Sequence, residues 1–248
     1  DLPLSRGLGD VYKRQEKTGS EGGKGAGQYF TPREIIDLAV RIIKPQHGEI
    51  IQDPSLGTGG FIKSANKYIK DNTDQLFDLK PHQIKFQKTK AYNGFELVAK
   101  VFYLFLMNML LNDIDGNFFN KNTLTEDGKN LEKSDVILAN PPFGVSTDES
   151  LMDRDDFLFQ TNNKQLAFLQ HIYRNLKPGG RAGVIFPDNV LFEEGLGKRI
   201  RVDLLNKCKI NCILRLPNGI FLNSKGNRTN LLFFERGQSD NNNTEQIL

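Results

Sequence analysis

The sequence has few of the residues that build disulfide frameworks or metal centres. It contains two cysteines, Cys208 and Cys212, and three histidines among 248 residues. Two cysteines are too few for a disulfide-stapled fold, and together with three histidines they form no recognisable zinc spacing. We therefore expect no metal site, and we expect both cysteines to be buried as small apolar side chains.

Long apolar segments and a strong excess of either charge are also missing. No apolar run approaches the ~18 residues that a membrane span requires. No charged-then-apolar leader opens the chain, so nothing indicates secretion, and we expect a cytoplasmic protein that makes no membrane contact. The formal net charge of +3 neither supports nor excludes nucleic-acid binding, because committed binders usually carry a strong basic patch.

The two ends of the chain differ in composition from its middle. Residues 1–26 are rich in glycine and charge and lack apolar periodicity, which predicts a disordered or artefactual leader. Residues 237–248 are rich in Asn, Gln and Asp, which is typical of a linker or a truncated tail. Residues 27–236 are expected to form one catalytic domain.

Within this middle region, predicted strands alternate with predicted helices. The strands are expected at residues 49–53, 91–95, 135–139, 182–186, 210–216 and 231–235, and the helices at 60–70, 97–112, 163–176 and 197–206. This alternation predicts an α/β fold with a doubly wound, mainly parallel sheet and helices on both faces. The lysine-rich segment 71–90 gives no clear pattern.

Two helices carry more detailed expectations. One begins at Thr31, with Thr31 as N-cap, Pro32 at the first helical position and Glu34 three residues after the cap. The other, at 97–112, is strongly apolar, and four of its side chains are expected to pack in the core: Phe102, Tyr103, Phe105 and Met109.

A glycine-rich turn, Asp53 to Phe61, follows the first predicted strand. In an open α/β sheet ligands bind at the carboxyl ends of the strands. Gly57, Gly59 and Gly60 would let the backbone turn sharply and approach a ligand closely. The turn lacks the third glycine of a Rossmann fingerprint and the Gly-Lys of a P-loop. A carboxylate at Asp53 favours a cationic ligand over a phosphorylated one, although it could also simply cap the turn.

A second acidic residue, Glu96, ends the next predicted strand. A carboxylate in this place can accept hydrogen bonds from both hydroxyls of a ribose, as in nucleotide-binding βαβ units. Its separation from Gly57 is nearly twice the ~20 residues usual in that unit, so the segment 71–90 would be an insertion. The alternative is an acid favoured at a helix start by the helix dipole.

The third motif, Asn140-Pro141-Pro142-Phe143, directly follows a predicted buried strand. An exocyclic amine on a base is a poor nucleophile because its lone pair is delocalised into the ring. Two acceptors on its N–H groups, the Asn140 side-chain oxygen and the Pro141 carbonyl, would redirect that lone pair toward an electrophile. The prolines stiffen the backbone, and Phe143 offers a flat face for a base.

The order of these motifs resembles that of S-adenosylmethionine-dependent amino-methyltransferases that act on adenine N6. Residues 27–33 resemble the motif that precedes the nucleotide loop in this class. Four later segments resemble the modification subunits of type I restriction-modification systems in particular: 168–171, 176–185, 187–192 and 216–221. The resemblance covers about residues 25–236 and implies a Rossmann-like methyltransferase domain over 27–236.

The resemblance also implies a role for each matching residue. S-adenosylmethionine would be bound by Gln28, Tyr29, Phe30, Thr31, Asp53, Gly57, Thr58, Gly59, Gly60, Phe61, Glu96 and Asn122. The catalytic residues would be Asn140, Pro141, Pro142 and Phe143, with Phe143 stacking on a flipped-out adenine. Asn122 departs from the family pattern, because it stands where an aspartate is usual.

The implied partners are duplex DNA and a separate specificity subunit, and the resemblance leaves open a second modification subunit and a restriction subunit. Two other interpretations stay open at this point. The motif Asn-Pro-Pro followed by an aromatic residue also suits an amino-methyltransferase that acts on RNA or on a protein glutamine. An inactive fragment that only binds the cofactor would carry the same sequence.

Overall fold

The computed structural model describes residues 30–145, 154–221, 228–240 and 243–244. The predicted leader at 1–26 and two expected cofactor-binding residues, Gln28 and Tyr29, lie outside these ranges.

The described chain folds around a seven-stranded sheet in the order β3-β2-β1-β4-β5-β7-β6. Its strands are β1 (Ile51–Asp53), β2 (Tyr92–Phe95), β3 (Asn117–Phe119), β4 (Ser134–Ala139), β5 (Leu176–Pro187), β6 (Cys208–Arg215) and β7 (Thr229–Arg236). The first five run parallel, and β7 is antiparallel to both β5 and β6. The strand order reverses between β1 and β4, and a doubly wound sheet binds its ligands at such a switch point.

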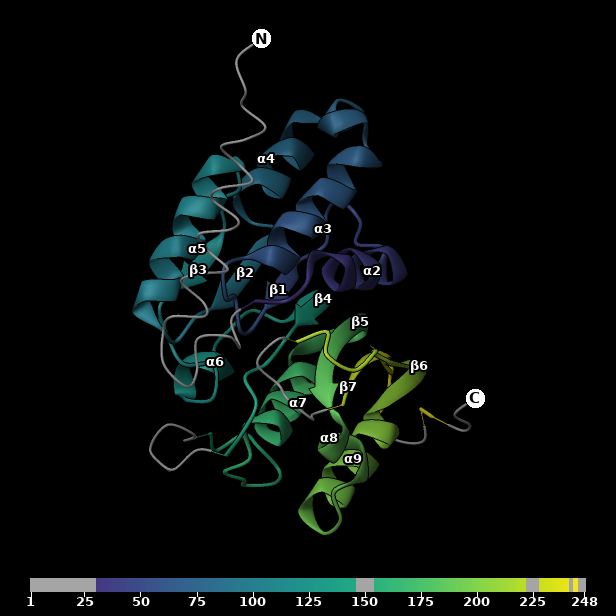
Figure 1. The fold of residues 1–248 in the computed structure, drawn as a ribbon. Helices are drawn as coiled ribbons and strands as arrows, with labels where there is room; N and C mark the ends of the chain where they lie inside the picture. Colours follow the sequence, from purple (N-terminus) through teal and green to yellow (C-terminus); the bar gives the residue numbers. More distant parts are fainter. Residues whose placement is uncertain (1–29, 146–153, 222–227, 241–242, 245–248) are drawn as a thin grey trace.

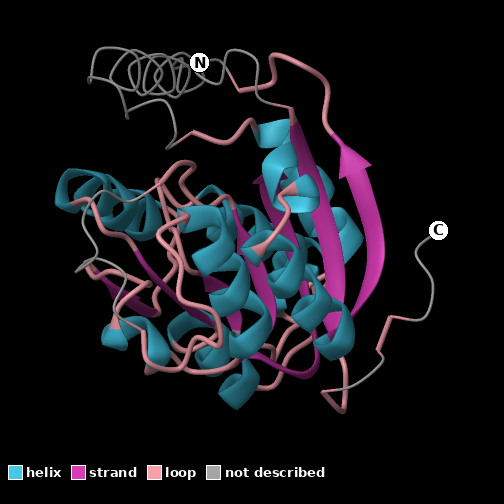
Figure 2. Cartoon of the chain, turned by 90° about the horizontal axis from the view of Figure 1, so that it is seen from below, coloured by secondary structure: helices cyan, strands magenta, loops and turns pink. Residues whose placement is uncertain are grey.

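Helices cover both faces of this sheet, which confirms the predicted doubly wound fold (Figures 1 and 2). They are α2 (Arg33–Ile43), α3 (Gly60–Asp71), α4 (Pro81–Thr89), α5 (Ala99–Leu111), α6 (Glu126–Lys129), α7 (Lys164–Asn175), α8 (Asp188–Phe192) and α9 (Leu196–Lys207), with a short 3₁₀ helix η2 (Asp74–Leu76). Figure 1 shows α2, α3 and α5 on one side of the sheet and α7 and α9 on the other.

Strand β4 shows how the sequence builds both layers at once. Val136 and Leu138 belong to the core shared with α2, α3 and α5, whereas Ile137 and Ala139 belong to the core shared with α7 and α9. All four are fully buried, because successive side chains of a strand point to opposite faces. Each large side chain buried in this way contributes about 1.5–3 kcal/mol.

The structure corrects the predicted start of α2. The helix begins at Arg33, Pro32 is its N-cap residue, and no side chain caps it. The Pro32 carbonyl oxygen accepts hydrogen bonds from the N–H groups of Ile35 and Ile36. Thr31 therefore does not cap this helix, and its hydroxyl group is left for another contact.

Several further expectations were wrong, each for its own reason. The elements β3, α4, α6 and α8 were missed, because each is short or lacks a clear apolar face. Cys208 is buried as expected, but Cys212 is exposed. Tyr103 is 67% exposed, whereas Phe105 and Met109 of the same helix are buried. Helix α5 is apolar on all sides, so its sequence does not show which side faces the core.

Candidate functional site

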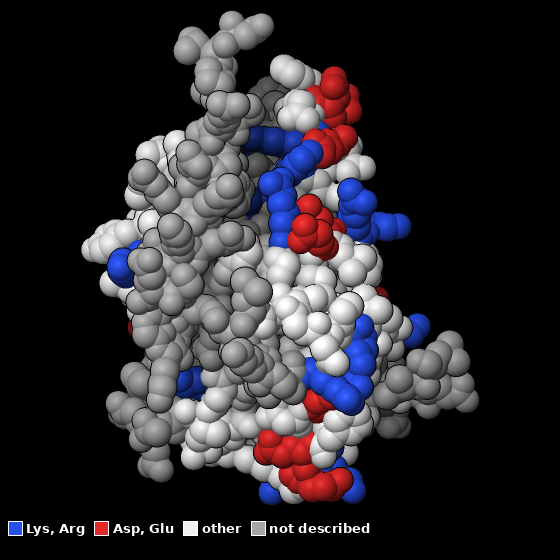
Figure 3. Space-filling view, in the orientation of Figure 1, with Lys and Arg blue, Asp and Glu red and all other residues white. Residues whose placement is uncertain are grey.

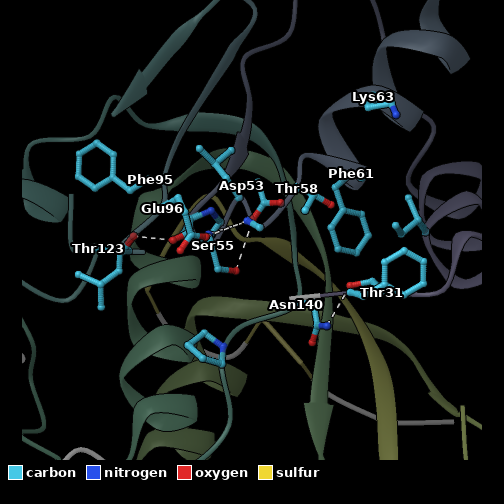
Figure 4. Close-up of a pocket in the computed structure, with 18 of the residues that line it drawn as sticks. Thr31, Asp53, Ser55, Thr58, Phe61, Lys63, Phe95, Glu96, Thr123 and Asn140 are labelled. Atoms are coloured by element: carbon cyan, nitrogen blue, oxygen red, sulfur yellow. Dashed lines mark hydrogen bonds between the residues drawn. The ribbon is translucent and has the colours of Figure 1, made fainter. Parts of the chain in front are cut away.

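A cavity of about 440 Å³ lies at the carboxyl ends of β1, β2 and β4, at the switch point of the sheet. Eleven of the expected site residues line it: Phe30, Thr31, Asp53, Gly57, Thr58, Gly60, Phe61, Glu96, Asn122, Asn140 and Pro142. Figure 4 shows the side chains from the turn after β1, from the end of β2 and from Asn140 around this one space. Residues that are far apart in the sequence thus meet where the fold favours a ligand.

In the turn after β1, glycine is required by the backbone conformation and, at Gly59, by close packing. Gly57 and Gly59 both have positive φ, of 53° and 87°, a conformation that favours glycine. A Cβ at Gly59 would lie 2.5 Å from Cε of Met109 and 2.9 Å from Cδ2 of Phe105. Gly59 does not line the cavity. Its missing side chain therefore serves the close packing of the turn against α5, not the close approach of a ligand.

Asp53, the last residue of β1, is 1% exposed. Its Oδ1 accepts a hydrogen bond of 3.0 Å from the N–H of Ser55. Burial and, to a smaller extent, the nearby Glu96 carboxylate raise the pKa of Asp53 to about 7, against the opposing effect of the Ser55 hydrogen bonds. The side chain is held in place, but its negative charge is poorly stabilised near neutral pH.

Glu96, immediately after β2, links the two loops that follow β1 and β2. Its Oε2 accepts a hydrogen bond of 2.9 Å from the N–H of Gly57, and its Oε1 accepts one of 2.8 Å from the N–H of Val98. Burial raises the pKa of this carboxyl group, while these hydrogen bonds act in the opposite direction. The carboxylate thus fixes the glycine turn and keeps one further lone pair on each oxygen for a ligand.

The loop after β3 forms the next wall of the cavity. The N–H of Leu124 donates to Oδ1 of Asn122 at 2.9 Å, and the hydroxyl of Thr123 donates to the Pro54 carbonyl at 2.5 Å. Behind this loop, Nη1 of the buried Arg154 donates to the Thr123 carbonyl at 2.8 Å. The wall is therefore tied both to the turn after β1 and to the segment that leads into α7.

Asn140, the first residue after β4, faces the cavity from the opposite side. Its Nδ2 donates a hydrogen bond of 2.9 Å to Oγ1 of Thr31 (Figure 4). Its Oδ1 is buried and has no hydrogen-bond partner among the described residues. A buried carbonyl oxygen without a partner costs about 1–3 kcal/mol, so the site favours a ligand that brings an N–H donor to this point.

The comparisons with known proteins agree with this geometry. The family model described as N-6 DNA Methylase matches residues 6–248. The chain belongs to this family.

Relatives of the chain include methylase subunits of type I restriction enzymes. The StySPI subunit of Salmonella potsdam and the EcoKI subunit of Escherichia coli (strain K12) are each 46% identical to it over 246 residues. Each match covers 96% of this chain and 46% of the relative, so the chain spans about half the length of these relatives.

The same relationship appears in the solved structures. The crystal structure of the EcoKI M protein superposes with a TM-score of 0.83 at 46% identity, covering 88% of this chain and 47% of that chain. A Listeria monocytogenes protein described as a class I S-adenosylmethionine-dependent methyltransferase superposes with a TM-score of 0.69 at 18% identity, covering 93% of this chain and 68% of that chain. This second likeness shows the fold alone. The expected methyltransferase fold is confirmed.

Some of the residues expected at the site do not line the cavity. Pro141 and Phe143 are not among its lining residues, and Phe143 packs against the core shared with α2, α3 and α5. The structure therefore does not place Phe143 where it would stack on a base in this cavity. Aromatic side chains that do line the cavity include Phe95, which ends β2, and Phe168 of α7.

Other lining residues were missed by the sequence analysis. Asn108 of α5 donates from Nδ2 to the Thr58 carbonyl at 2.9 Å, and Thr123 closes the wall described above. Lys63 and Lys67 of α3 and Lys121 also line the cavity. No local pattern marks these residues, because only the packing of separate helices and loops brings them to the site.

Proposed function

We propose that this chain is the catalytic domain of a DNA adenine-N6 methyltransferase that uses S-adenosylmethionine, within the modification subunit of a type I restriction-modification complex. The observation that supports this most strongly is the buried, unpartnered Oδ1 of Asn140 at the switch-point cavity. The names of the relatives and the family match support the same function.

The residues on the β1 and β2 side fit S-adenosylmethionine. A cavity of about 440 Å³ lies within the ~300–1,000 Å³ typical of sites for small molecules and cofactors. Asp53 would attract the cationic methionine portion, and Glu96 would accept hydrogen bonds from the ribose hydroxyls. Phe61 and Phe95 supply apolar walls. When bound, S-adenosylmethionine supplies an electrophilic methyl group on a sulfonium sulfur.

The β4 side fits an amine of low nucleophilicity. Oδ1 of Asn140 would accept a hydrogen bond from the adenine N6 amine. The Pro141 carbonyl would accept a second one after the bound substrate brings Pro141, which does not line the cavity in this structure, to the site. Both acceptors pull the amine toward tetrahedral geometry, which frees its lone pair for attack. Proximity and these two acceptors favour direct transfer: the N6–CH₃ bond would form as the S–CH₃ bond breaks, S-adenosylhomocysteine would leave, and the N6 nitrogen would release a proton to water, so no covalent nucleophile is required. An adenine must leave the DNA stack to reach this depth.

Sequence recognition is assigned to a separate specificity subunit. On the face shown in Figure 3, lysines and arginines of the described residues lie beside acidic residues and do not form one broad basic surface. The formal charge of the whole chain is only +3. Binding of duplex DNA depends largely on phosphate contacts by Lys and Arg, so a partner is needed to hold the DNA while a base is flipped.

A methyl-transfer assay tests this proposal. The 248-residue chain and its full-length counterpart, the latter with the specificity subunit encoded beside it, are incubated with tritiated S-adenosylmethionine and with genomic DNA, RNA or protein. We expect the chain alone to bind the cofactor without sequence-specific transfer, and the complex to label adenine N6 in DNA. Labelling of RNA or glutamine instead would replace the proposed substrate. Efficient specific labelling by the chain alone would overturn the type I assignment.

A further inference from the structure

The Thr31 hydroxyl is the only hydrogen-bond partner that the described residues offer to the Asn140 carboxamide, through Nδ2 at 2.9 Å. The other polar atom of that carboxamide, Oδ1, is the one that faces an incoming amine without a partner. In this structure the contact engages the NH₂ end of the amide, and the oxygen end is left for the substrate.

This contact matters because a carboxamide can present either end. The terminal torsion of Asn is broad and roughly two-fold, so rotation by half a turn exchanges the oxygen and the nitrogen. An NH₂ group turned toward an amine would oppose donor with donor, whereas the oxygen accepts from it. The Thr31 hydroxyl can donate or accept, and as an acceptor from Nδ2 it stabilises the orientation in which Oδ1 meets the incoming amine.

Thr31 is well placed to be such an anchor. It precedes Pro32, and the residue before a proline is confined to extended conformations. The helix that follows, α2, packs against the sheet through Ile36, Val40 and Ile43, which are all buried in the core. Thr31 does not cap this helix, although its sequence position is suited to capping. The hydroxyl is therefore available for Asn140.

We propose that Thr31 is a positioning residue for methyl transfer, which holds the Asn140 carboxamide with its oxygen toward the acceptor amine. This inference rests on the proposed function and changes one part of it. The sequence resemblance assigns Thr31 to cofactor binding, whereas the contact assigns its hydroxyl to the acceptor side of the cavity.

The test uses the full-length modification subunit in its complex with the specificity subunit. Thr31→Val removes the hydroxyl group and keeps the shape, and Thr31→Ser keeps the hydroxyl. Thr89→Val is the matched control, because it removes a threonine hydroxyl that bonds the Lys85 carbonyl on an exposed part of α4. The measurements are the single-turnover rate of methyl transfer, the calorimetric affinity for S-adenosylmethionine and the melting temperature.

We expect Thr31→Val to lower the single-turnover rate about tenfold, the effect of losing one hydrogen bond. Cofactor affinity should stay within about twofold, and the Ser variant should recover most of the rate. In the Asn140→Ala background, Thr31→Val should cause no further loss, because Thr31 acts through Asn140. Thr89→Val should match the wild type.

Two outcomes would overturn the inference. A wild-type rate in Thr31→Val would show that the contact does not matter. Weakened cofactor binding with an unchanged single-turnover rate would make Thr31 a cofactor contact. These outcomes differ from a failure of the proposed function, in which the wild-type complex would methylate another acceptor or none. If it uses another acceptor, the ratio between variant and wild type is measured on that acceptor.

Discussion

The buried polar groups on the two sides of the cavity differ in whether they have hydrogen-bond partners. On the β1 and β2 side, the carboxylates of Asp53 and Glu96 accept hydrogen bonds from backbone N–H groups of Ser55, Gly57 and Val98. On the β4 side, Oδ1 of Asn140 has no partner among the described residues. On the first side backbone donors already hold both carboxylates before any ligand binds, whereas on the second side the Asn140 oxygen gains a partner only from a donor that arrives. This contrast predicts separable defects in cofactor binding and in methyl transfer.

The largest effect should follow from Asn140→Ala. We expect the rate of methyl transfer to fall by ~10²-fold or more, because the acceptor of the target amine is lost. Affinity for S-adenosylmethionine should remain nearly unchanged, as measured by calorimetry. Asn130→Ala is a suitable control, because the Asn130 amide bonds only the Glu126 carbonyl on an exposed surface. Wild-type methylation by Asn140→Ala in the full complex would contradict the assignment of the target amine to the β4 side.

The next effect concerns the carboxylates. We expect Asp53→Ala and Glu96→Ala each to weaken S-adenosylmethionine binding by about 1.5–3 kcal/mol, because each removes one charge-assisted partner. Glu194→Ala, which breaks an exposed ion pair with Lys198 at residues that do not line the cavity, serves as the control in the same titration. Unchanged affinity in both variants would mean that the cofactor does not use this side.

The third effect is a pH dependence that only the β1 side should show. The pKa of Asp53 is raised to about 7, so in the free protein the carboxyl is increasingly protonated as the pH falls through 7. A cationic ligand prefers the ionised form, so affinity for S-adenosylmethionine should fall as the pH drops below about 7, by up to tenfold per pH unit. Titrations between pH 5.5 and 8.5 measure this slope. Asp53→Asn should bind more weakly and lose the slope, and a slope that persists in this variant would point to another group.

The same raised pKa affects the stability of the ligand-free protein. Between pH 3.8, which is the ordinary pKa of this group, and about pH 7, the Asp53 carboxyl is protonated in the folded state and ionised in the unfolded state. Stability from this group therefore falls as the pH rises through that window and stays low above it. Asp53→Asn should accordingly raise the melting temperature at pH 8 and have little effect below pH 4. An equal change at both pH values would show that the effect is unrelated to ionisation.

The smallest effect should come from the loop after β3. Thr123→Val removes the hydrogen bond from the Thr123 hydroxyl to the Pro54 carbonyl, which ties this loop to the turn after β1. We expect a loss of about 1 kcal/mol in the free energy of unfolding and a similarly small loss in cofactor affinity. Denaturant unfolding and calorimetry measure the two quantities, and Thr125→Val, which loses a local bond to the Asn122 carbonyl, is the comparison. If Thr125→Val weakens cofactor binding more, the tie to Pro54 has no special importance.

The sequence predicts the fold and the chemical groups of the site better than it predicts their contacts. The parallel sheet and the position of Asp53, Glu96 and Asn140 at strand ends follow from local apolar patterns and short motifs. The contact between Thr31 and Asn140 does not, because it joins residues 109 positions apart through the packing of α2 on the sheet. At Thr31 the local pattern even favoured a different role, as a helix cap.

Gly59 and Phe143 also show that a sequence motif does not determine the contacts of each of its residues. Both belong to motifs in which other residues line the cavity, and both were assigned to the ligand. The structure packs Gly59 against Phe105 and Met109, and it packs Phe143 against the core. A motif shows which residues lie near a site, but the neighbouring helices decide which of them face it.

The position of β7 has a consequence for the way this chain acquires its structure. Among the described strands β7 comes last in the sequence, yet it lies between β5 and β6 and pairs with both. Strand β6 is made earlier on the ribosome and has no direct neighbour in the sheet until residues 229–236 emerge. The strands β7 and β6 can therefore join the five parallel strands only after residues 229–236 are made, through contacts between distant parts of the chain, which form slowly. A growing chain would hold β5 and β6 with open edges until then, and a chaperone that covers exposed strands should speed its maturation.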